Sequence, residues 1–248
     1  MTGAAEGHWA AAFFSGRRVL VTGGASGIGA AIAAEFAAAG AAVTATGVGE
    51  EELLAAEPAA GVTVVRLDVR DGAAVRDLLA GQSSLQVVVN CAGTIRRGEE
   101  LQPDVFAEVV DVNLTGSMRV CAAARPLLAR SRGAIVNMAS MLSFFGGGLV
   151  PGYAASKGGI VQMTKSLAIA YAADGIRVNA LAPGWIRTNL TRPLQEDAAR
   201  ESAILARTPL GRWGVPADLA APALFLASPL AVFVTGAVLP VDGGYASA

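Results

Sequence analysis

Seven short apolar runs alternate with helix-forming segments along the chain, and this alternation constrains the fold more than any other feature. The runs span residues 17–24, 41–46, 62–67, 85–93, 133–140, 176–183 and 237–244. Their apolar residues are mostly consecutive instead of alternating with polar ones, which is typical of strands covered on both faces of a parallel sheet. The pattern predicts an α/β fold with a doubly wound parallel sheet and helices on both faces.

The segments between these runs carry helix signals. The predicted helices span residues 27–40, 71–81, 103–131 and 153–175. Gly40 and Gly175 are suited to end the first and last of them, and Pro126 is expected to bend or break the third. Because no linker or change of composition divides the chain, we predict a single domain over residues 1–248, in which residues 1–15 form an N-terminal tail.

Charge and cysteine content argue against several classes of protein. The 248 residues include 19 basic and 20 acidic ones, so we expect no nucleic-acid partner and no binding to a membrane surface. Cys91 and Cys121 lack metal-ligand spacing, and two thiols in a chain of this length indicate a reducing, cytoplasmic location. The single histidine, His8, lies in the predicted tail, which leaves no Ser-His-Asp triad and no metal site to expect.

Residues 221–241 carry no charge and are long enough to cross a bilayer, so a membrane-spanning helix is one interpretation of them. Pro222, Pro229, Gly236 and Pro240 interrupt the segment. These residues favour a helix, a loop and then a buried strand over a single long helix. The N-terminus shows no basic region followed by an apolar run and a cleavage site, so no secretion signal is expected.

The stretch "TGGASGIG" (22–29) connects the first apolar run to the first predicted helix. Small residues there allow the backbone to approach a pyrophosphate, and the start of the helix presents free N–H groups and partial positive charge. The alternative is a tight turn that needs glycine only for its backbone conformation. Its position after the first strand of an alternating pattern favours the nucleotide site.

The end of the second apolar run is the position that contacts the adenosine ribose in such folds. An acid there binds the 2′-hydroxyl, whereas a basic residue accepts a 2′-phosphate. Here the residues are Thr46, Gly47 and Val48, followed by three glutamates at 50–52. Neither determinant is present, but the glutamates would repel a phosphate, so the sequence weakly favours NAD over NADP.

Three polar residues lie at or after the end of the fifth run. Ser140 ends that run, and Tyr153 and Lys157 stand four residues apart at the start of a predicted helix. Residues i and i+4 share a helix face, so the ammonium can lie beside the phenol. Taken singly, each has an ordinary structural explanation, namely a surface pair for Tyr153 and Lys157 and a cap for Ser140.

Together these motifs resemble the short-chain dehydrogenase/reductase family. The segments "TGGASGIG", "NCAG" (90–93), Asn113, Ser140 with "YAASK" (153–157) and "PGWIRT" (183–188) follow that family's order over nearly the whole chain. The resemblance implies a Rossmann-type sheet of seven parallel strands, hydride transfer between a nicotinamide and a carbonyl or alcohol, and a homotetramer. Cys91 stands where the family usually has a second asparagine.

The resemblance also implies the residues of the site. The catalytic set is Asn113, Ser140, Tyr153 and Lys157. The cofactor-binding set is Gly23, Ser26, Gly27, Ile28, Gly29, Gly47, Asp68, Val69, Asn90, Ala92, Gly93, Tyr153, Lys157, Pro183, Gly184, Ile186 and Thr188.

The spacing of Tyr153 and Lys157 also makes chemical sense. Lowering the tyrosine pKa from about 10 by about three units takes about 4 kcal/mol. One positive charge about 4 Å away supplies about that energy at an effective dielectric constant of about 20, and an oxidised nicotinamide ring would add a second positive charge, so Lys157 and the cofactor together are expected to lower the pKa of Tyr153. Tyr153 would then exchange a proton with the substrate oxygen, Ser140 would hydrogen-bond the same oxygen, and Lys157 would bind the nicotinamide ribose. Asn113 would hold a water that relays protons from Lys157 to solvent.

The substrate is less constrained. The stretches "AGTIRR" (92–97), "ASMLSFFGG" (139–147) and "RTPLGRWG" (207–214) resemble the sugar-acid dehydrogenase branch of the family, which includes gluconate 5-dehydrogenase and 2-dehydro-3-deoxy-gluconate 5-dehydrogenase. A sugar acid needs a cation for its carboxylate. The candidate substrate residues are Arg96, Arg97, Arg212, Met141, Phe144 and Phe145. Residues 185–213 lack strong periodicity and are expected to form a mobile substrate lid.

Two other functions stay open from the sequence. One is a 3-oxoacyl-type or other carbonyl reductase, which would share the chemistry and differ in substrate. The other is a non-catalytic nucleotide-binding scaffold, but the chain keeps both Tyr153 and Lys157, which such a protein does not need.

Overall fold

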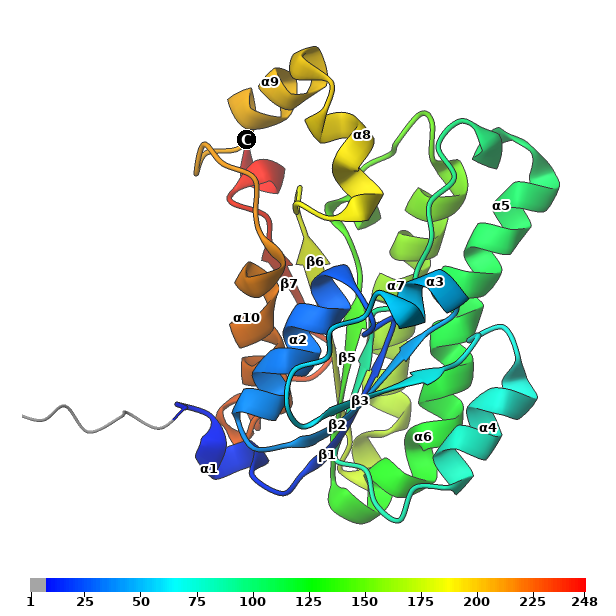
Figure 1. The fold of residues 1–248 in the computed structure, drawn as a ribbon, viewed down its shortest axis with the longest axis vertical. Helices are drawn as coiled ribbons and strands as arrows, with labels where there is room; N and C mark the ends of the chain where they lie inside the picture. Colours follow the sequence, from blue (N-terminus) through cyan, green and yellow to red (C-terminus); the bar gives the residue numbers. More distant parts are fainter. Residues whose placement is uncertain (1–7) are drawn as a thin grey trace, which may run out of the picture.

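The computed structural model describes residues 8–248 and confirms the predicted parallel sheet (Figure 1). The strands are β1 (Arg18–Thr22), β2 (Ala42–Gly47), β3 (Val62–Arg66), β4 (Val87–Asn90), β5 (Ala134–Met138), β6 (Arg177–Pro183) and β7 (Val238–Val241). They form one sheet in the order β3-β2-β1-β4-β5-β6-β7, and all neighbours are parallel. Each strand falls within one of the seven apolar runs, except that β2 extends one residue further, to Gly47.

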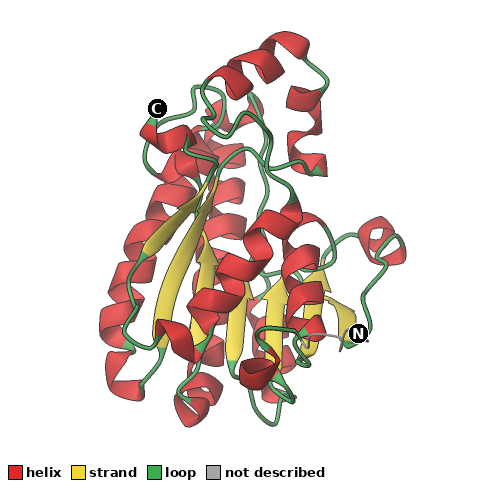
Figure 2. Ribbon diagram, turned by 90° about the vertical axis from the view of Figure 1, so that its left-hand side faces the viewer, coloured by secondary structure: helices red, strands yellow, loops and turns green. Residues whose placement is uncertain are grey.

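Helices cover both faces of the sheet, as Figure 2 shows. One face carries α2 (Gly27–Ala38) and α10 (Ala220–Ala227), and the other carries α4 (Gly72–Ala80), α6 (Ser117–Ser131) and α7 (Pro151–Ala170). Successive residues of a strand point to opposite faces. In β1, Val19 and Val21 pack with the first set of helices, whereas Leu20 packs with the second. The consecutive apolar residues are therefore explained by two separate cores.

The remaining elements are shorter. The helices are α1 (Ala11–Phe14), α3 (Glu50–Leu54), α5 (Pro103–Val110), α8 (Arg192–Gln195) and α9 (Ala198–Ala206). Short turns of 3₁₀ helix are η1 (Glu99–Leu101), η3 (Met141–Ser143), η4 (Ala172–Asp174), η5 (Asn189–Thr191), η6 (Pro216–Leu219), η7 (Pro229–Ala231) and η8 (Tyr245–Ser247). A turn of π helix, η2 (Asp111–Gly116), joins α5 to α6.

The helix predicted over residues 103–131 is interrupted at a different place from the expected one. Pro126 lies inside α6, which is assigned without a break, so the prediction of a break at this proline is wrong. Pro126 and Ala122 are both exposed, so water can satisfy the carbonyl that the proline leaves free. The irregularity lies instead at the π turn η2, which contains Asn113. Such turns occur mostly at functional sites.

Residues 221–241 and the described part of the predicted N-terminal tail both contain regular secondary structure. Residues 221–241 form α10, a loop with η7 and then β7, and no helix within residues 8–248 is both long and apolar enough to span a membrane. Residues 1–7 of the predicted N-terminal tail lie outside the described residues. Its remainder includes α1, where Phe14 is buried and stacks edge-on against Phe36 with ring centroids 4.9 Å apart.

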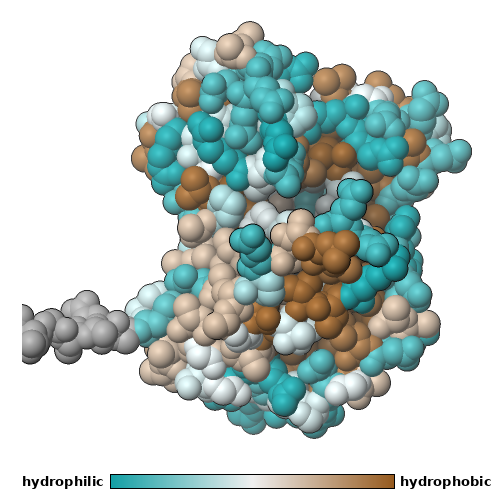
Figure 3. Space-filling view, in the orientation of Figure 1, coloured by the Kyte–Doolittle hydropathy of each residue, from teal (hydrophilic) through white to brown (hydrophobic). Residues whose placement is uncertain are grey.

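The order of the strands reverses between β1 and β4, and this determines where a ligand can bind. Helices after β1 and β4 leave toward opposite faces, so a crevice opens at the carboxyl ends of these strands. Helices α8 and α9 lie beyond the same ends of the strands (Figure 1), and the surface is hollowed beneath them (Figure 3). The glycine loop and three residues of the predicted catalytic set, Ser140, Tyr153 and Lys157, lie around this crevice.

Candidate active site

The glycines of the loop after β1 are required by close backbone approach. A Cβ atom on Gly23 would lie 2.7 Å from the Cα of Ala92, which follows β4, and Gly23 has a left-handed φ of 64°. A Cβ atom on Gly29 would collide with the carbonyl oxygen of Gly23. Gly27 also adopts a positive φ, of 55°. The loop is therefore pressed against the β4 loop, and no side chain fills the space in front of helix α2.

The start of α2 presents free hydrogen-bond donors. Its N-cap residue, Ser26, does not cap the helix, because Ser26 Oγ donates to Glu52 Oε1 at 2.7 Å instead. The first turn contains no acidic residue. The N–H groups of Gly27, Ile28 and Gly29 thus remain available, and the helix dipole adds partial positive charge there. This arrangement fits the pyrophosphate of a dinucleotide.

A cavity of about 450 Å³ extends from this helix start to the catalytic set. It is lined by the predicted cofactor residues Gly23, Ser26, Gly27, Ile28, Gly29, Gly93, Pro183, Gly184, Ile186 and Thr188, and by Ser140, Tyr153 and Lys157. Thr188 lies beside Gly27, since a Cβ atom on that glycine would be 3.6 Å from Thr188 Cγ2. The loop after β6 therefore closes over the glycine loop.

A second cavity, of about 340 Å³, adjoins the first on the side of β2 and β3. It is lined by the predicted cofactor residues Gly23, Gly47, Asp68, Val69, Ala92 and Gly93. A hydrogen bond from Arg70 at 2.7 Å holds the pKa of Asp68 below its usual value. Asn90, in contrast, lines neither cavity; it is buried and donates from Nδ2 to Asn137 Oδ1 at 2.8 Å. The two cavities match the two halves of a dinucleotide on either side of its pyrophosphate.

The sequence did not identify Glu52 as a single site residue. Its carboxylate accepts from Ser26 Oγ and, at 3.3 Å, from the Val48 N–H, and it lines both cavities. A Cβ atom on Gly47 would lie 2.9 Å from Glu52 Oε2, so the carboxylate occupies the space that a larger residue at the end of β2 would fill. Three consecutive glutamates at 50–52 gave no sign of which one turns inward.

Lys157 is buried at the centre of the first cavity. Its Nζ atom donates to the Met138 carbonyl oxygen at 2.7 Å and lies 5.5 Å from the ring centroid of Tyr153. The one-turn spacing in α7 therefore brings the two side chains together, as the sequence predicts. Burial lowers the pKa of Lys157 from 10.5 to about 8.

The pKa of Tyr153 shifts in the direction opposite to the sequence expectation. Burial raises the pKa of Tyr153 above its ordinary value of 10.0. The hydrogen bond with Ser140 and the charge of Arg97 oppose this effect only in part. The phenol is therefore protonated at neutral pH, which suits a proton donor.

Asn113 is fully buried in the π turn, and its side chain is occupied by protein partners. Its Oδ1 atom accepts from the Thr94 N–H at 2.7 Å, and its Nδ2 atom donates to the Thr94 carbonyl and to Ser156 Oγ, both at 3.0 Å. Both amide hydrogens are thereby used. The side chain fixes the loop after β4 against α7, and only the second lone pair of its Oδ1 atom could still accept a hydrogen bond from water.

Two residues that the sequence did not identify hold the catalytic set in place. Ser143 Oγ accepts from the Ser140 N–H at 3.2 Å and donates to the Lys157 carbonyl at 2.7 Å, so it links the serine loop to α7. The buried carboxylate of Glu100 accepts from the Tyr153 N–H at 2.7 Å and from the Arg96 N–H at 2.8 Å. Glu100 thus caps the start of α7 in the turn that carries Tyr153.

A third cavity, of about 330 Å³, adjoins the catalytic residues on the side of α8 and α9. Ser140 and Tyr153 line it, together with the predicted substrate residues Arg97, Met141 and Phe145. Two further arginines, Arg200 and Arg207, also line it, and its lining contains no carboxylate. The cavity therefore favours an anionic substrate.

The other predicted substrate residues lie elsewhere. Arg96 lines the second cavity and pairs with Glu99 at 2.6 Å, so the structure does not bring it to Tyr153 and Ser140. Arg212 pairs with Asp218 at 2.7 Å and lines a smaller, separate cavity of about 190 Å³. Phe144 is half exposed and is not among the residues that line the third cavity.

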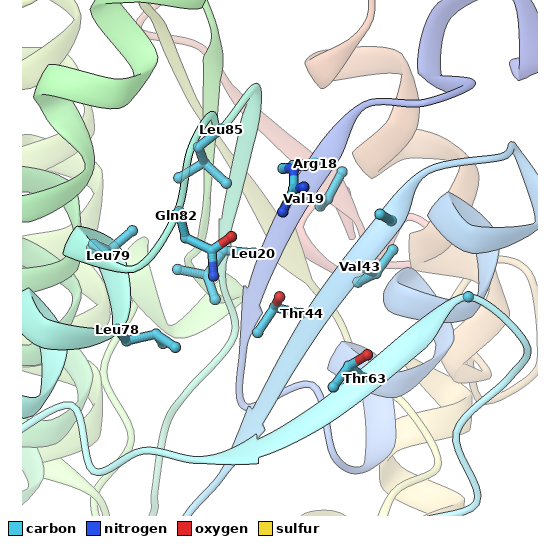
Figure 4. Close-up of a pocket in the computed structure, with 12 residues that line it drawn as sticks. Arg18, Val19, Leu20, Val43, Thr44, Thr63, Leu78, Leu79, Gln82 and Leu85 are labelled. Carbon is cyan, nitrogen blue, oxygen red and sulfur yellow. The ribbon is translucent and has the colours of Figure 1, made fainter.

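A cavity of about 150 Å³ lies far from these residues, between the sheet and α4 (Figure 4). It is lined by residues of β1, β2 and β3 at or near their amino ends and by leucines of α4. Arg18 is its only charged lining residue. Ligands of open parallel sheets bind at the carboxyl ends of the strands, so this cavity has no part in the site.

The sheet order, the glycine loop and the buried Tyr153–Lys157 pair define an oxidoreductase that uses a nicotinamide dinucleotide. The profile of the family described as enoyl-(acyl carrier protein) reductase matches residues 23–246. The chain belongs to the short-chain dehydrogenase/reductase family, whose members use NAD or NADP and act on CH–OH groups.

Individual relatives cover almost the whole chain. The 2-dehydro-3-deoxy-D-gluconate 5-dehydrogenase of Bacillus subtilis (strain 168) is 40% identical over 242 residues, which are 94% of this chain and 95% of the relative. The 3-oxoacyl-(acyl-carrier-protein) reductase FabG of Chlamydia muridarum is 37% identical over 243 residues, 93% and 97% of the two chains. The crystal structure of a gluconate 5-dehydrogenase from Burkholderia cenocepacia J2315, in complex with NADP and tartrate, is 37% identical with a TM-score of 0.87, covering 95% of this chain and 97% of that one.

Proposed function

We propose that this protein interconverts a secondary alcohol and a ketone on a sugar acid, such as gluconate or a 3-deoxy-gluconate, with a nicotinamide dinucleotide as the redox partner. The observation that carries the substrate class is the third cavity, where Tyr153 and Ser140 share their space with three arginines and no carboxylate. The names of the relatives from Bacillus subtilis and Burkholderia cenocepacia support the same class.

The proposed mechanism uses the chain's own residues for every proton step. When bound, the nicotinamide ring supplies or accepts the hydride. Tyr153 donates its proton to the substrate oxygen during reduction and takes it back during oxidation. Ser140 hydrogen-bonds the same oxygen and stabilises negative charge on it. The ammonium group of Lys157 would hold the ribose hydroxyls and favour the phenolate form of Tyr153.

A panel of substrates tests the proposal. Purified protein is assayed with NADH and NADPH against 5-keto-gluconate, a 2-keto-3-deoxy-gluconate oxidised at carbon 5, and an acetoacetyl thioester. Turnover of either keto acid with little on the thioester is expected. Activity on the thioester alone would reject the sugar-acid proposal and favour a 3-oxoacyl reductase, the second candidate, which the Chlamydia muridarum relative supports. Tight dinucleotide binding without turnover of any compound would favour a non-catalytic nucleotide-binding scaffold over an enzyme.

For the dinucleotide itself, we infer a preference for NAD, and Glu52 is the residue that supports it. Its carboxylate lines the cavity of Gly47 and Asp68, where the adenosine ribose would lie, and would repel a 2′-phosphate. Binding constants for NADH and NADPH, measured by quenching of protein fluorescence, test this. Glu52→Gln should narrow the difference between the binding constants for NADH and NADPH. Tighter binding of NADPH than of NADH by the unmodified protein would reject the preference for NAD. The Burkholderia cenocepacia relative binds NADP, so the direct comparison is needed.

We further propose a homotetramer in the cytoplasm, in which residues 185–213 act as a substrate lid. Exposed apolar side chains support self-association: Ile169 at the end of α7 is 81% exposed and Phe233 is fully exposed. Ile169 and Phe233 belong to neighbouring segments of the chain. A Cβ atom on Gly236, three residues after Phe233, would lie 3.5 Å from the Cβ atom of Ala168, which precedes Ile169. Within the lid segment, α8 and α9 contribute Leu194 and Arg200 to the third cavity, so their movement would open it.

A further inference from the structure

Arg207 is a free cation at the third cavity. It follows α9 directly, and its guanidinium carbon lies 4.4 Å from the ring centroid of Tyr245 and 5.1 Å from that of Phe145. Within residues 8–248, its guanidinium takes part in no ion pair and no hydrogen bond to another side chain. The two ring centroids lie 6.1 Å from each other, so both rings contact the guanidinium from one side, and the N–H groups on its other side stay available to a ligand.

The other two arginines that line the cavity, Arg200 and Arg97, already have polar partners within the protein. Arg200 pairs with Asp197 at 3.2 Å, and Arg97 donates from Nη1 to the Leu190 carbonyl at 3.0 Å. The charge of Arg97 lowers the pKa of Tyr153, against the larger effect of burial. The cavity thus has one cation that acts on Tyr153 and a free one beside Phe145 and Tyr245.

The ring that holds Arg207 is fixed by the C-terminal turn. Asp242 accepts from the Gly244 N–H at 2.9 Å and from the Ala246 N–H at 2.8 Å, on either side of Tyr245. The Tyr245 ring also packs edge-on against Trp185, with centroids 6.1 Å apart. Arg207 is therefore pre-oriented, and a ligand that pairs with it loses less side-chain entropy on binding.

We propose that Arg207, packed beside Phe145 and Tyr245, binds the carboxylate of the substrate. The site then selects hydroxy acids over neutral alcohols, because Arg207 lines the same cavity as Ser140 and Tyr153. A guanidinium edge and a carboxylate form two parallel hydrogen bonds, a geometry that a neutral hydroxymethyl group cannot reproduce. This inference rests on the proposed function and adds to it the residue that binds the carboxylate of the substrate.

Gluconate and glucitol form a matched pair of substrates for the test, since glucitol has a hydroxymethyl group in place of the carboxylate. Arg207→Gln removes the charge of an exposed side chain and should raise KM for gluconate about 10- to 100-fold, with kcat and the glucitol constants within about twofold. Tyr245→Ala should give a smaller rise and Tyr245→Phe none. Arg130→Gln, an exposed arginine in the last turn of α6 that does not line the cavity, is the control.

Binding of gluconate to protein saturated with NADH, measured by calorimetry, gives a readout independent of turnover. If the wild type oxidises gluconate and Arg207→Gln matches it, the carboxylate site is wrong and the proposed function stands. If the wild type binds gluconate in an Arg207-dependent manner without oxidising it, the proposed function fails and the site stands. Equal losses on gluconate and glucitol, or no gluconate binding by the wild type, overturn the carboxylate site.

Discussion

At the scale of single residues, the site depends on two buried groups whose protonation is shifted by their surroundings. Burial raises the pKa of Tyr153 and lowers that of Lys157 to about 8. Both shifts favour the neutral form of the side chain, as expected where water is excluded. The chain retains this unfavourable arrangement at the proposed catalytic centre, where the proposed mechanism uses a protonated phenol and a nearby ammonium group.

Lys157 should cost stability at neutral pH. Its pKa is 10.5 ordinarily and about 8 in the fold, so the unfolded chain binds more protons between these values. Stability therefore rises with pH through that window, and the cost is fully present below about pH 8. The shift corresponds to about 3 kcal/mol, partly offset by about 1 kcal/mol from the bond to Met138.

Replacing Lys157 by methionine should accordingly raise the free energy of unfolding at pH 7 by about 1–2 kcal/mol while abolishing turnover. Urea denaturation at pH 7 and at pH 9.5 measures this, and the advantage of Lys157→Met should shrink at the higher pH. A variant that is less stable than the wild type at pH 7 would show that the lysine contributes more through its contacts than its burial costs.

The two directions of reaction should respond differently to pH. Reduction uses the protonated phenol, which a raised pKa maintains at neutral pH, so its kcat/KM should be flat between pH 6 and 8. Oxidation uses the deprotonated form, and its kcat/KM should increase about tenfold per pH unit over the same range. Initial rates of oxidation and reduction, measured as a function of pH with one alcohol–ketone pair, test both expectations. Oxidation rates that do not change with pH would contradict Tyr153 as the base.

At the scale of elements, each part of the site is positioned by the end of one element and fixed by a contact to another. The glycine loop after β1 packs on the loop after β4, and the π turn carries Asn113 to both Thr94 and Ser156. Glu100 caps the turn of α7 that contains Tyr153. These contacts join segments that are distant in sequence, so the catalytic geometry requires the complete sheet.

Gly29→Ala should weaken dinucleotide binding strongly, because the new methyl group would collide with the Gly23 carbonyl and push α2 away from β1. We expect the dissociation constant for NADH to rise at least about tenfold and stability to fall by about 1–3 kcal/mol. Gly158→Ala is the matched control, since its Cβ atom would meet no neighbour and would favour helix α7 by about 0.5–1 kcal/mol. Fluorescence titration that gives the same constant for Gly29→Ala and the wild type would reject the steric role of this glycine.

At the scale of the whole molecule, the alternation of apolar runs predicted the seven strands and their layers because both faces of a parallel sheet must be buried. Motifs with fixed spacing on one element, such as Tyr153 and Lys157, could also be predicted. The roles of Glu52, Glu100 and Arg207 could not, because each depends on a contact between separate elements. The π turn arises from packing around Asn113 and has no local sequence signal.

The proposed tetramer belongs to the same scale. Phe233→Glu places a charge in the exposed apolar region near the end of α7 and should lower the mass of the assembly. Light scattering after gel filtration measures the mass of wild type and variant under identical conditions. A wild-type mass equal to one chain of 25.0 kDa would contradict self-association through this region.

The account depends most on Tyr153 as the group that exchanges a proton with the substrate, and Tyr153→Phe tests this directly. The variant removes one hydroxyl group and keeps the ring that packs against Lys157. Turnover in both directions should fall at least about a thousandfold, while the NADH dissociation constant measured by fluorescence stays within about threefold of the wild type. Turnover within tenfold of the wild type, with dinucleotide binding intact, would contradict the mechanism.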